Sequence, residues 1–267
     1  MNILFTIDRN YITQMLVCVR SIVRYPAPEG YDFYILHSSL SQEDMALIRA
    51  REEENVRFHF AQANASDFDG FPETDRYPKE MYYRILTADY LPQLDRALYL
   101  DPDIVVKNPL QPLYESEFGE DLFIATTHVD ALLTRVNSRR LGLREAVPYV
   151  NTGVLLLNLP LMKRAVRLSD IRAFVAERGK VMTLPDQDVV TALYGKRVRL
   201  VDDMVYNLSD RMLALYNAKH PDAPRGLAWV DANAVIIHYC GANKPWKDRY
   251  LGVLGRYYEE LAGNGTT

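Results

Sequence analysis

The sequence predicts an α/β protein in which a Rossmann-like mixed sheet is flanked by helices. Short apolar segments alternate with helical ones through the first half of the 267 residues, which is typical of parallel strands wrapped by helices. The second half mixes strands and helices less regularly, and neither a repeat nor a Pro/Gly/Ser-rich linker divides the chain. We therefore expect residues 1–267 to form a single domain.

Hydrophobic periodicity assigns the elements of the first half. Strands are predicted where short apolar runs occur, at 2–7, 31–36, 56–60 and 96–100. Helices are predicted where apolar residues recur three or four positions apart, over 11–23, from Ser41 onward and over 78–90. Pro26 and Pro28 close the first helix, and Asp44 stands in capping-box position relative to Ser41 in the second.

The second half is assigned in the same way. Strands are predicted at 122–126, 153–158, 198–201, around Val205 and at 234–237. Helices are predicted at 161–178, 188–194 and 250–261, whereas 127–150 is expected to be irregular and exposed.

Composition and charge exclude several classes of protein. The 48% hydrophobic and 25% charged residues are those of an ordinary soluble globular domain. The net charge of −4 argues against a nucleic-acid partner, which usually requires a basic excess. The N-terminus lacks the basic region of a signal peptide. Every apolar stretch falls short of the ~20 residues that cross a bilayer, so we expect no transmembrane segment.

The two cysteines indicate a reducing compartment. Cys18 and Cys240 lie far apart and form no C-x-x-C pair, so a cytoplasmic location is the simplest expectation. Four familiar catalytic or nucleotide-binding motifs are also missing from the sequence: G-x-G-x-x-G, the P-loop, H-E-x-x-H and G-x-S-x-G. These absences disfavour an oxidoreductase, a P-loop NTPase, a zinc protease and a serine hydrolase.

The end of the strand at 96–100 carries the most informative pattern. Asp101 and Asp103 follow it two residues apart, so both carboxylates lie on one side of an extended chain. Pro102 is expected to keep that chain extended. Ligands of open α/β sheets bind at the carboxyl ends of strands, where two carboxylates can hold a divalent cation beside a diphosphate. The alternative is a solvated turn.

A second strand end has a similar character. The apolar segment 234–237 leads into His238, which is suited to complete a metal site with Asp101 and Asp103. Gly241 permits close approach of a phosphate, and Lys244 can neutralise its charge. The alternative for His238 is a hydrogen-bonded histidine without a ligand.

Six segments, taken together and in order, resemble glycosyltransferase family 8. This family includes bacterial lipooligosaccharide galactosyltransferases and lipopolysaccharide glucosyltransferases, with glycogenin as a relative. The segments span nearly the whole chain: Phe5-Thr-Ile-Asp8-Arg-Asn10-Tyr11, Tyr82-Tyr83-Arg84, Asp101-Pro-Asp103, Tyr149-Val-Asn151-Thr-Gly153-Val, Pro185-Asp186-Gln187-Asp188 and His238-Tyr-Cys-Gly241-Ala-Asn-Lys244-Pro-Trp246.

The resemblance implies a GT-A fold, a UDP-galactose or UDP-glucose donor, and manganese as the cofactor with magnesium as the second candidate. Asp101, Asp103 and His238 would then bind the metal. The other implied contacts with the nucleotide sugar are Asp8, Asn10 and Tyr11 around the uridine, Arg84, Asp101, Asn151, Asp186 and Gln187 around the sugar, Gly241 and Lys244 at the diphosphate, and Thr6 and Pro102, which are assigned to the donor as a whole.

Four of these residues have plain structural alternatives. Tyr11 can be a core residue of its helix, and Arg84 a surface residue lying over Tyr82. Asn151 can cap a turn, and Asp186 can cap a helix.

The implied reaction is a retaining hexosyl transfer to a surface glycan or glycolipid. Gln187 would stabilise developing positive charge without forming a covalent bond, and Asp186 would bind sugar hydroxyls, while Asp188 points away along its helix. Two alternatives stay open: nucleotidyl transfer to a sugar phosphate, and a non-catalytic protein that binds sugar nucleotides.

Acceptor identity, oligomeric state and the choice between galactose and glucose do not follow from the sequence. Arginines at 135, 139, 140 and 144, in the expected acceptor loop, suit either an acidic acceptor or a solvated surface. Galactosyltransferase-type relatives attach to membranes through a basic, aromatic tail. After Tyr257-Tyr-Glu-Glu-Leu the sequence continues only to Gly263-Asn-Gly-Thr-Thr, which has no basic residue, so a peripheral position at the inner face of the membrane is the second expectation after a plain cytoplasmic one.

Overall fold

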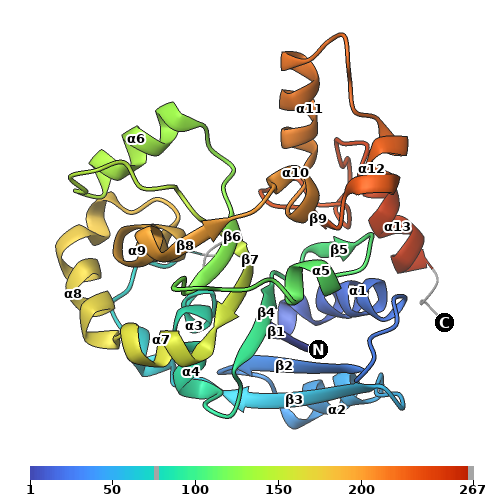
Figure 1. The fold of residues 1–267 in the computed structure, drawn as a ribbon. Coiled ribbons are helices and arrows are strands. Elements are labelled where there is room, and N and C mark those ends of the chain that lie inside the picture. Colours follow the sequence, from blue (N-terminus) through green and yellow to red (C-terminus); the bar gives the residue numbers. More distant parts are fainter. Residues whose placement is uncertain (75–77, 264–267) are drawn as a thin grey trace.

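The computed structural model describes residues 1–74 and 78–263, which form a central seven-stranded sheet (Figure 1). The strand order is β3-β2-β1-β4-β7-β6-β8. The strands are β1 (Asn2–Thr6), β2 (Tyr31–His37), β3 (Val56–Gln62), β4 (Arg96–Leu100), β6 (Phe123–Thr126), β7 (Asn151–Asn158) and β8 (Val198–Leu200). The first four strands in the chain run parallel, whereas β7 is antiparallel to both neighbours. The predicted mixed sheet is confirmed.

The first half of the chain follows the predicted alternation. Helix α1 (Ile12–Val23) connects β1 to β2, and α2 (Gln42–Arg49) connects β2 to β3. The capping box at the start of α2 is present: Ser41 accepts from the backbone of Asp44, and the Asp44 side chain accepts from Ser41. A short 3-10 turn, Arg9–Tyr11, precedes α1 and is capped by Asp8.

Side chains alternate between two apolar cores on opposite faces of the sheet. Ile3 and Phe5 of β1 join the core beneath α1, whereas Leu4 joins the core beneath the helices of the other face. Leu98 and Tyr99 of β4 divide in the same way. With both faces covered, the central strands are apolar throughout, which is why they appear in the sequence as continuous apolar runs.

A second, two-stranded sheet places the later site residues. Strand β5 (Ile104–Val106) pairs antiparallel with β9 (Ile236–His238), and Ile104 lies opposite His238. Helices α10 (Asp203–Tyr206), α11 (Asp210–Lys219), α12 (Leu227–Asn233) and α13 (Gly255–Gly263) surround β9, as Figure 1 shows in orange and red. Their apolar side chains form a third core with Val105 and Ile237.

The remaining helices lie mostly on the other face of the large sheet. They are α3 (Glu80–Tyr83), α4 (Thr87–Tyr90), α5 (Gln111–Tyr114), α6 (Ala131–Arg140), α7 (Leu159–Ala165), α8 (Leu168–Arg178) and α9 (Pro185–Tyr194). Among the residues described, no helix combines the length and the apolar character that a membrane span requires.

Several predicted elements were wrong in detail. The predicted helix at 161–178 is two helices, because Val166 is extended (φ −88°, ψ 128°). The predicted helix at 78–90 contains a 3-10 segment, Arg84–Leu86. Val205 lies in helix α10 rather than in a strand. The closing helix begins at Gly255, five residues later than predicted.

Besides α10, three further helices in the second half, α6, α11 and α12, were not predicted. Helix α6 lies inside the segment expected to be irregular, and Asp130 caps it by accepting from the backbone of Leu133 at 2.9 Å. Leu132 and Val136 of α6 are more than half exposed, so the helix lacks the buried apolar stripe that periodicity detects. Helices α11 and α12 were missed for the same reason: each places a single residue, Leu213 or Val230, in the buried class.

Candidate active site

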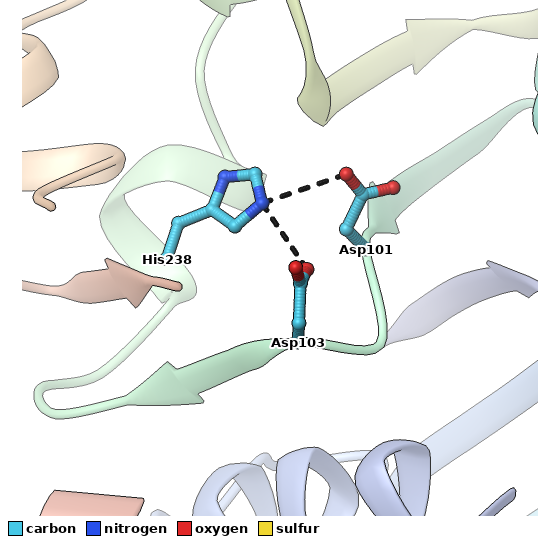
Figure 2. A group of neighbouring side chains, drawn as sticks. All are labelled: Asp101, Asp103 and His238. Carbon is cyan, nitrogen blue, oxygen red and sulfur yellow. Dashed lines mark ion pairs between the residues drawn. The ribbon is translucent and has the colours of Figure 1, made fainter. Parts of the chain in front are cut away.

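Asp101, Asp103 and His238 converge where the two sheets meet (Figure 2). Asp101 follows β4, Asp103 precedes β5, and His238 ends β9. The Nε2 atom of His238 lies 3.1 Å from Oδ1 of Asp103 and 3.5 Å from Oδ2 of Asp101. One ligand atom from each residue lies within 4.8 Å of the others, which is close enough for all three to coordinate one cation.

The two aspartates do not lie along an extended chain, so that part of the prediction was wrong. Pro102 and Asp103 form a turn between β4 and β5. The chain leaves the large sheet after Asp101 and enters the small one at Ile104, and this change of sheet requires a turn. The carboxylates still face the same gap, as the sequence predicted.

Each aspartate has one oxygen held by a neighbour and one that faces the gap. Oδ1 of Asp101 accepts from Nη1 of Arg84 at 2.9 Å and from the hydroxyl of Tyr99 at 2.6 Å. Oδ2 of Asp103 accepts from Nζ of Lys244. Oδ1 of Asp103 is buried, and no hydrogen-bond partner for it exists among the described residues.

A buried, unpartnered carboxylate oxygen is costly unless a cation accompanies it. The three atoms facing the gap are one oxygen from each aspartate and the imidazole nitrogen of His238. A ligand set of two oxygens and one nitrogen suits manganese. It suits magnesium less well, because magnesium prefers oxygen ligands. The residues present therefore fit a divalent cation.

The charges around Asp103 keep it ionised. Its burial alone would raise the pKa, but the contacts of its carboxylate with His238 and Lys244 hold the pKa well below its usual range. Burial conversely lowers the pKa of Lys244, and the Asp103 carboxylate raises it above the ordinary value. Both groups thus carry their charges at neutral pH.

Glycine at position 153 makes room for the aspartate–histidine group. A Cβ atom there would lie 2.7 Å from Oδ2 of Asp101 and closer still to the ring of His238. Any side chain would therefore displace one of the two. The backbone oxygen of Gly153 also accepts from the amide of Asp101 at 2.8 Å, which holds the turn against β7.

A cavity of about 180 Å³ joins the expected site residues. All of those named from the sequence line it except Asn10: Thr6, Asp8, Tyr11, Arg84, Asp101, Pro102, Asp103, Asn151, Asp186, Gln187, His238, Gly241 and Lys244. Asn10 is exposed and donates its side-chain amide to Asp8 at 2.8 Å. Six segments from separate parts of the chain therefore form one hollow.

Arg84 is part of the site rather than a surface residue. It is 6% exposed, lies 4.2 Å from the ring centre of Tyr99 and donates to Asp101 and to the backbone of Thr152. Its Nη1 atom is 3.6 Å from Asp186, whose pKa is raised by burial. Asp186 also accepts from the hydroxyl of Thr152 at 2.5 Å, so it is not a helix cap.

A larger cavity of about 860 Å³ opens beside the first. Its lining comes mainly from the start of α11, the segment 239–243, the loop 250–253 and the ends of the segment 127–150. Five residues line both cavities: Asn151, Gln187, His238, Cys240 and Gly241. A molecule in the small cavity and another in the large one would therefore meet beside Gln187.

Sequence reasoning missed several residues of this region. His128 lies in no motif of the sequence, yet it lines the larger cavity. Asn207 and Tyr99 contact site residues from positions where the sequence shows no motif. Cys240 lies within the motif that starts at His238 and was given no role. Tyr99 lies within an apolar strand, so the sequence indicated a core residue and not the hydrogen bond of its hydroxyl to Asp101. Nothing in the sequence around Asn207 indicated a role for it.

The burial of His128 predicts a fall in stability at acid pH. Burial lowers the pKa of His128 from 6.5 to about 4. The folded protein therefore keeps His128 neutral while the unfolded chain takes up a proton below pH 6.5, so stability present above that pH is lost as the pH falls toward 4. The expected loss is about 2–3 kcal/mol by pH 4.5.

Urea unfolding of the metal-free protein at pH 7.5 and 4.5 measures this loss. Because other groups also titrate in this range, the informative quantity is the difference between the parent and His128→Asn. The variant should lose less stability on acidification than the parent does. Equal losses in the two proteins would show that His128 is not responsible.

The fold and the site together define a glycosyltransferase of the GT-A fold. The crystal structure of the galactosyltransferase LgtC with donor and acceptor sugar analogues matches with a TM-score of 0.83 and 27% identity, over 100% of this chain and 97% of that one. The chain belongs to glycosyl transferase family 8, whose family model matches residues 2–249. The family predicted from the sequence motifs is confirmed.

Relatives with assigned names are similar over most of their length. A putative glycosyltransferase of Haemophilus influenzae is 28% identical over 92% of this chain and 73% of its own. The lipopolysaccharide 1,2-glucosyltransferase of Escherichia coli K12 is 26% identical over 97% of this chain and 76% of its own. The lipopolysaccharide 1,3-galactosyltransferase of Salmonella typhimurium is 25% identical over 98% and 78%.

Proposed function

We propose that this protein is a metal-dependent, retaining hexosyltransferase that uses UDP-galactose or UDP-glucose. The observation that carries the proposal is the meeting of two cavities at Gln187 and His238. The small cavity contains the cation-binding group and a lysine, as a sugar diphosphate requires, and the large one is open to a second substrate. We propose that residues 1–267 act as one domain in this reaction.

The donor is proposed to lie along the small cavity. Asp8 and Tyr11 would hold the uridine, with Thr6 at its base and Asn10 orienting Asp8 from outside. Asp101, Asp103 and His238 would bind manganese, which would neutralise the diphosphate.

Lys244 and Gly241 are proposed to complete the diphosphate site. Lys244 lines the small cavity, and its Nζ atom is held beside the cation-binding group by Asp103 and by the backbone oxygen of Tyr239 at 2.8 Å. Gly241 has φ +99°, a conformation that leaves its backbone open to close approach by a phosphate.

The sugar is proposed to lie beside Arg84, Asn151, Asp186 and Gln187. A double displacement would need a free carboxylate below the anomeric carbon. Asp188 is fully buried and bound to Arg140, and Asp186 is bound to Thr152. This leaves the amide of Gln187 at the junction of the cavities, which supports transfer on the same face with retention.

The acceptor is proposed to be a surface glycan or glycolipid bound in the larger cavity. Relatives named for lipopolysaccharide glucosyl and galactosyl transfer support this class. Arg140 is engaged by Asp188 and is therefore not available to an acidic acceptor, unlike the more exposed Arg135 and Arg139. The free thiols of Cys18 and Cys240 suit a reducing, cytoplasmic location.

The test measures UDP release from UDP-galactose and UDP-glucose with manganese, with glycan acceptors added in turn. One donor should be consumed faster, and proton NMR of the first product should show the α configuration of the donor retained. A parallel assay supplies UTP and a sugar 1-phosphate, and release of pyrophosphate there would favour nucleotidyl transfer instead. A β-linked product would contradict the retaining route, and binding of UDP-sugars without turnover would indicate a non-catalytic protein.

A further inference from the structure

Asn207 is a fully buried residue between the cation-binding group and the larger cavity. It follows α10 and is 0% exposed. Its side-chain amide nitrogen donates to Oγ1 of Thr126 at 2.8 Å and to Oδ1 of Asn151 at 2.9 Å. Its side-chain oxygen lies 2.8 Å from Nδ1 of His238, and its backbone oxygen lies 3.0 Å from Nε2 of His128.

The orientation of the Asn207 amide follows from a backbone donor. The amide N–H of Gly153 donates to the side chain of Asn151 at 3.0 Å, so the receiving atom of Asn151 must be its oxygen. The atom of Asn207 that contacts this oxygen must then be the nitrogen. The remaining atom, which faces His238, is therefore the oxygen of Asn207.

This orientation determines which nitrogen of His238 carries a hydrogen. An amide oxygen can only accept, so Nδ1 of His238 must donate to Asn207. The neutral imidazole then leaves Nε2 with a lone pair, and Nε2 is the atom that faces Asp101 and Asp103. In the opposite tautomer, two lone pairs would face each other at Asn207 and a hydrogen would occupy the direction of the cation.

We infer that Asn207 is a positioning residue that holds His238 in the tautomer and ring orientation needed for binding a divalent cation. The inference rests on the proposed function, which takes Asp101, Asp103 and His238 as metal ligands. Asn207 lines neither cavity and so has no contact with substrate. Outer hydrogen bonds to a ligating histidine typically change metal affinity 10- to 100-fold, and this size of effect is expected here.

Two variants at position 207 separate positioning from packing. Asn207→Ala removes the acceptor of the His238 hydrogen bond. Asn207→Asp keeps an oxygen at that place but loses the donors to Thr126 and Asn151. Thr126→Val is a matched control, because it removes a neighbour of Asn207 and leaves the contact with His238 intact.

The experiment titrates each metal-free protein with Mn²⁺ alone and measures free Mn²⁺ by electron paramagnetic resonance. Circular dichroism of each metal-free variant checks its fold. We expect Asn207→Ala to raise the Mn²⁺ Kd by about 10- to 100-fold. Asn207→Asp and Thr126→Val should stay within about threefold of the parent, since each keeps the acceptor for Nδ1.

Each outcome decides the inference. The inference is overturned if the Mn²⁺ Kd of Asn207→Ala equals that of the parent protein. It is also overturned if Asn207→Ala and Asn207→Asp weaken Mn²⁺ binding equally. If Asn207→Ala does not fold, Asn207→Leu takes its place, because leucine fills a similar volume without an acceptor for Nδ1, and a Kd equal to that of the parent there overturns the inference. A parent protein that binds no Mn²⁺ would refute the proposed metal site itself, whereas a parent that binds it with unchanged variants would refute only the role of Asn207.

Discussion

Asp103→Asn is expected to lower the rate of UDP release by about 10³-fold or more, the largest effect predicted for catalysis. The substitution keeps the volume of the side chain and removes its charge. Asparagine keeps only one of the two carboxylate oxygens, so the contacts with His238 and Lys244 cannot both have an oxygen acceptor. It also removes the negative charge that balances Lys244. Since these contacts are buried, neither loss is compensated by solvent. UDP release with saturating manganese measures the change.

Removal of the metal is the companion test. EDTA should abolish UDP release from the parent protein, and manganese should restore it better than magnesium, because the group includes an imidazole ligand. For the Asp103→Asn variant, Asp32→Asn is the matched control. Asp32 is also paired with basic side chains, Arg57 and His59, but it lies on β2 away from the site. Full turnover in EDTA would refute the metal-dependent reaction.

The local sequence predicted the strands of the large sheet because their signal does not depend on distant residues. Strands such as β1, β2 and β4 are buried on both faces and appear as apolar runs. Helix α2 was predicted at its start because its capping box lies within four residues. Helix α6 was missed, since its exposed Leu132 and Val136 give no apolar stripe.

The site was predictable to the extent that its residues end apolar strands or belong to family motifs. Asp101, Asp103 and His238 met both conditions, and the structure brings them together. Asn207 met neither, because its role depends on three partners distant in the sequence. The turn at Pro102 was also unpredictable, since nothing local shows that the chain changes sheets between β4 and β5.

Asp188→Ala is expected to destabilise the protein by about 3–5 kcal/mol, because it removes a fully buried carboxylate and leaves the buried hydroxyl of Tyr149 and the partly exposed Arg140 without their partner. The Asp188 carboxylate is 0% exposed and receives two hydrogen bonds from Arg140, at 2.6 and 2.8 Å. It also accepts from the hydroxyl of Tyr149 at 2.8 Å and from the backbone of Thr183 at 2.7 Å. These contacts fasten the start of α9 to α6 and to the segment before β7. Urea unfolding measures the loss.

Gln187→Ala provides the comparison, since Gln187 is the neighbour of Asp188 in the chain but lines the two cavities. Gln187 is half-buried. Its truncation should leave stability within about 1 kcal/mol of the parent while slowing transfer, with residual activity because no covalent bond is lost. Asp188→Ala should show the reverse pattern. It should lower the free energy of unfolding more than Gln187→Ala does, and it should reduce turnover per folded molecule less than Gln187→Ala does. If Asp188→Ala instead keeps parental stability and loses all turnover, or if a glycosyl adduct forms on Asp188, then this carboxylate takes part in the chemistry and the same-face route is wrong.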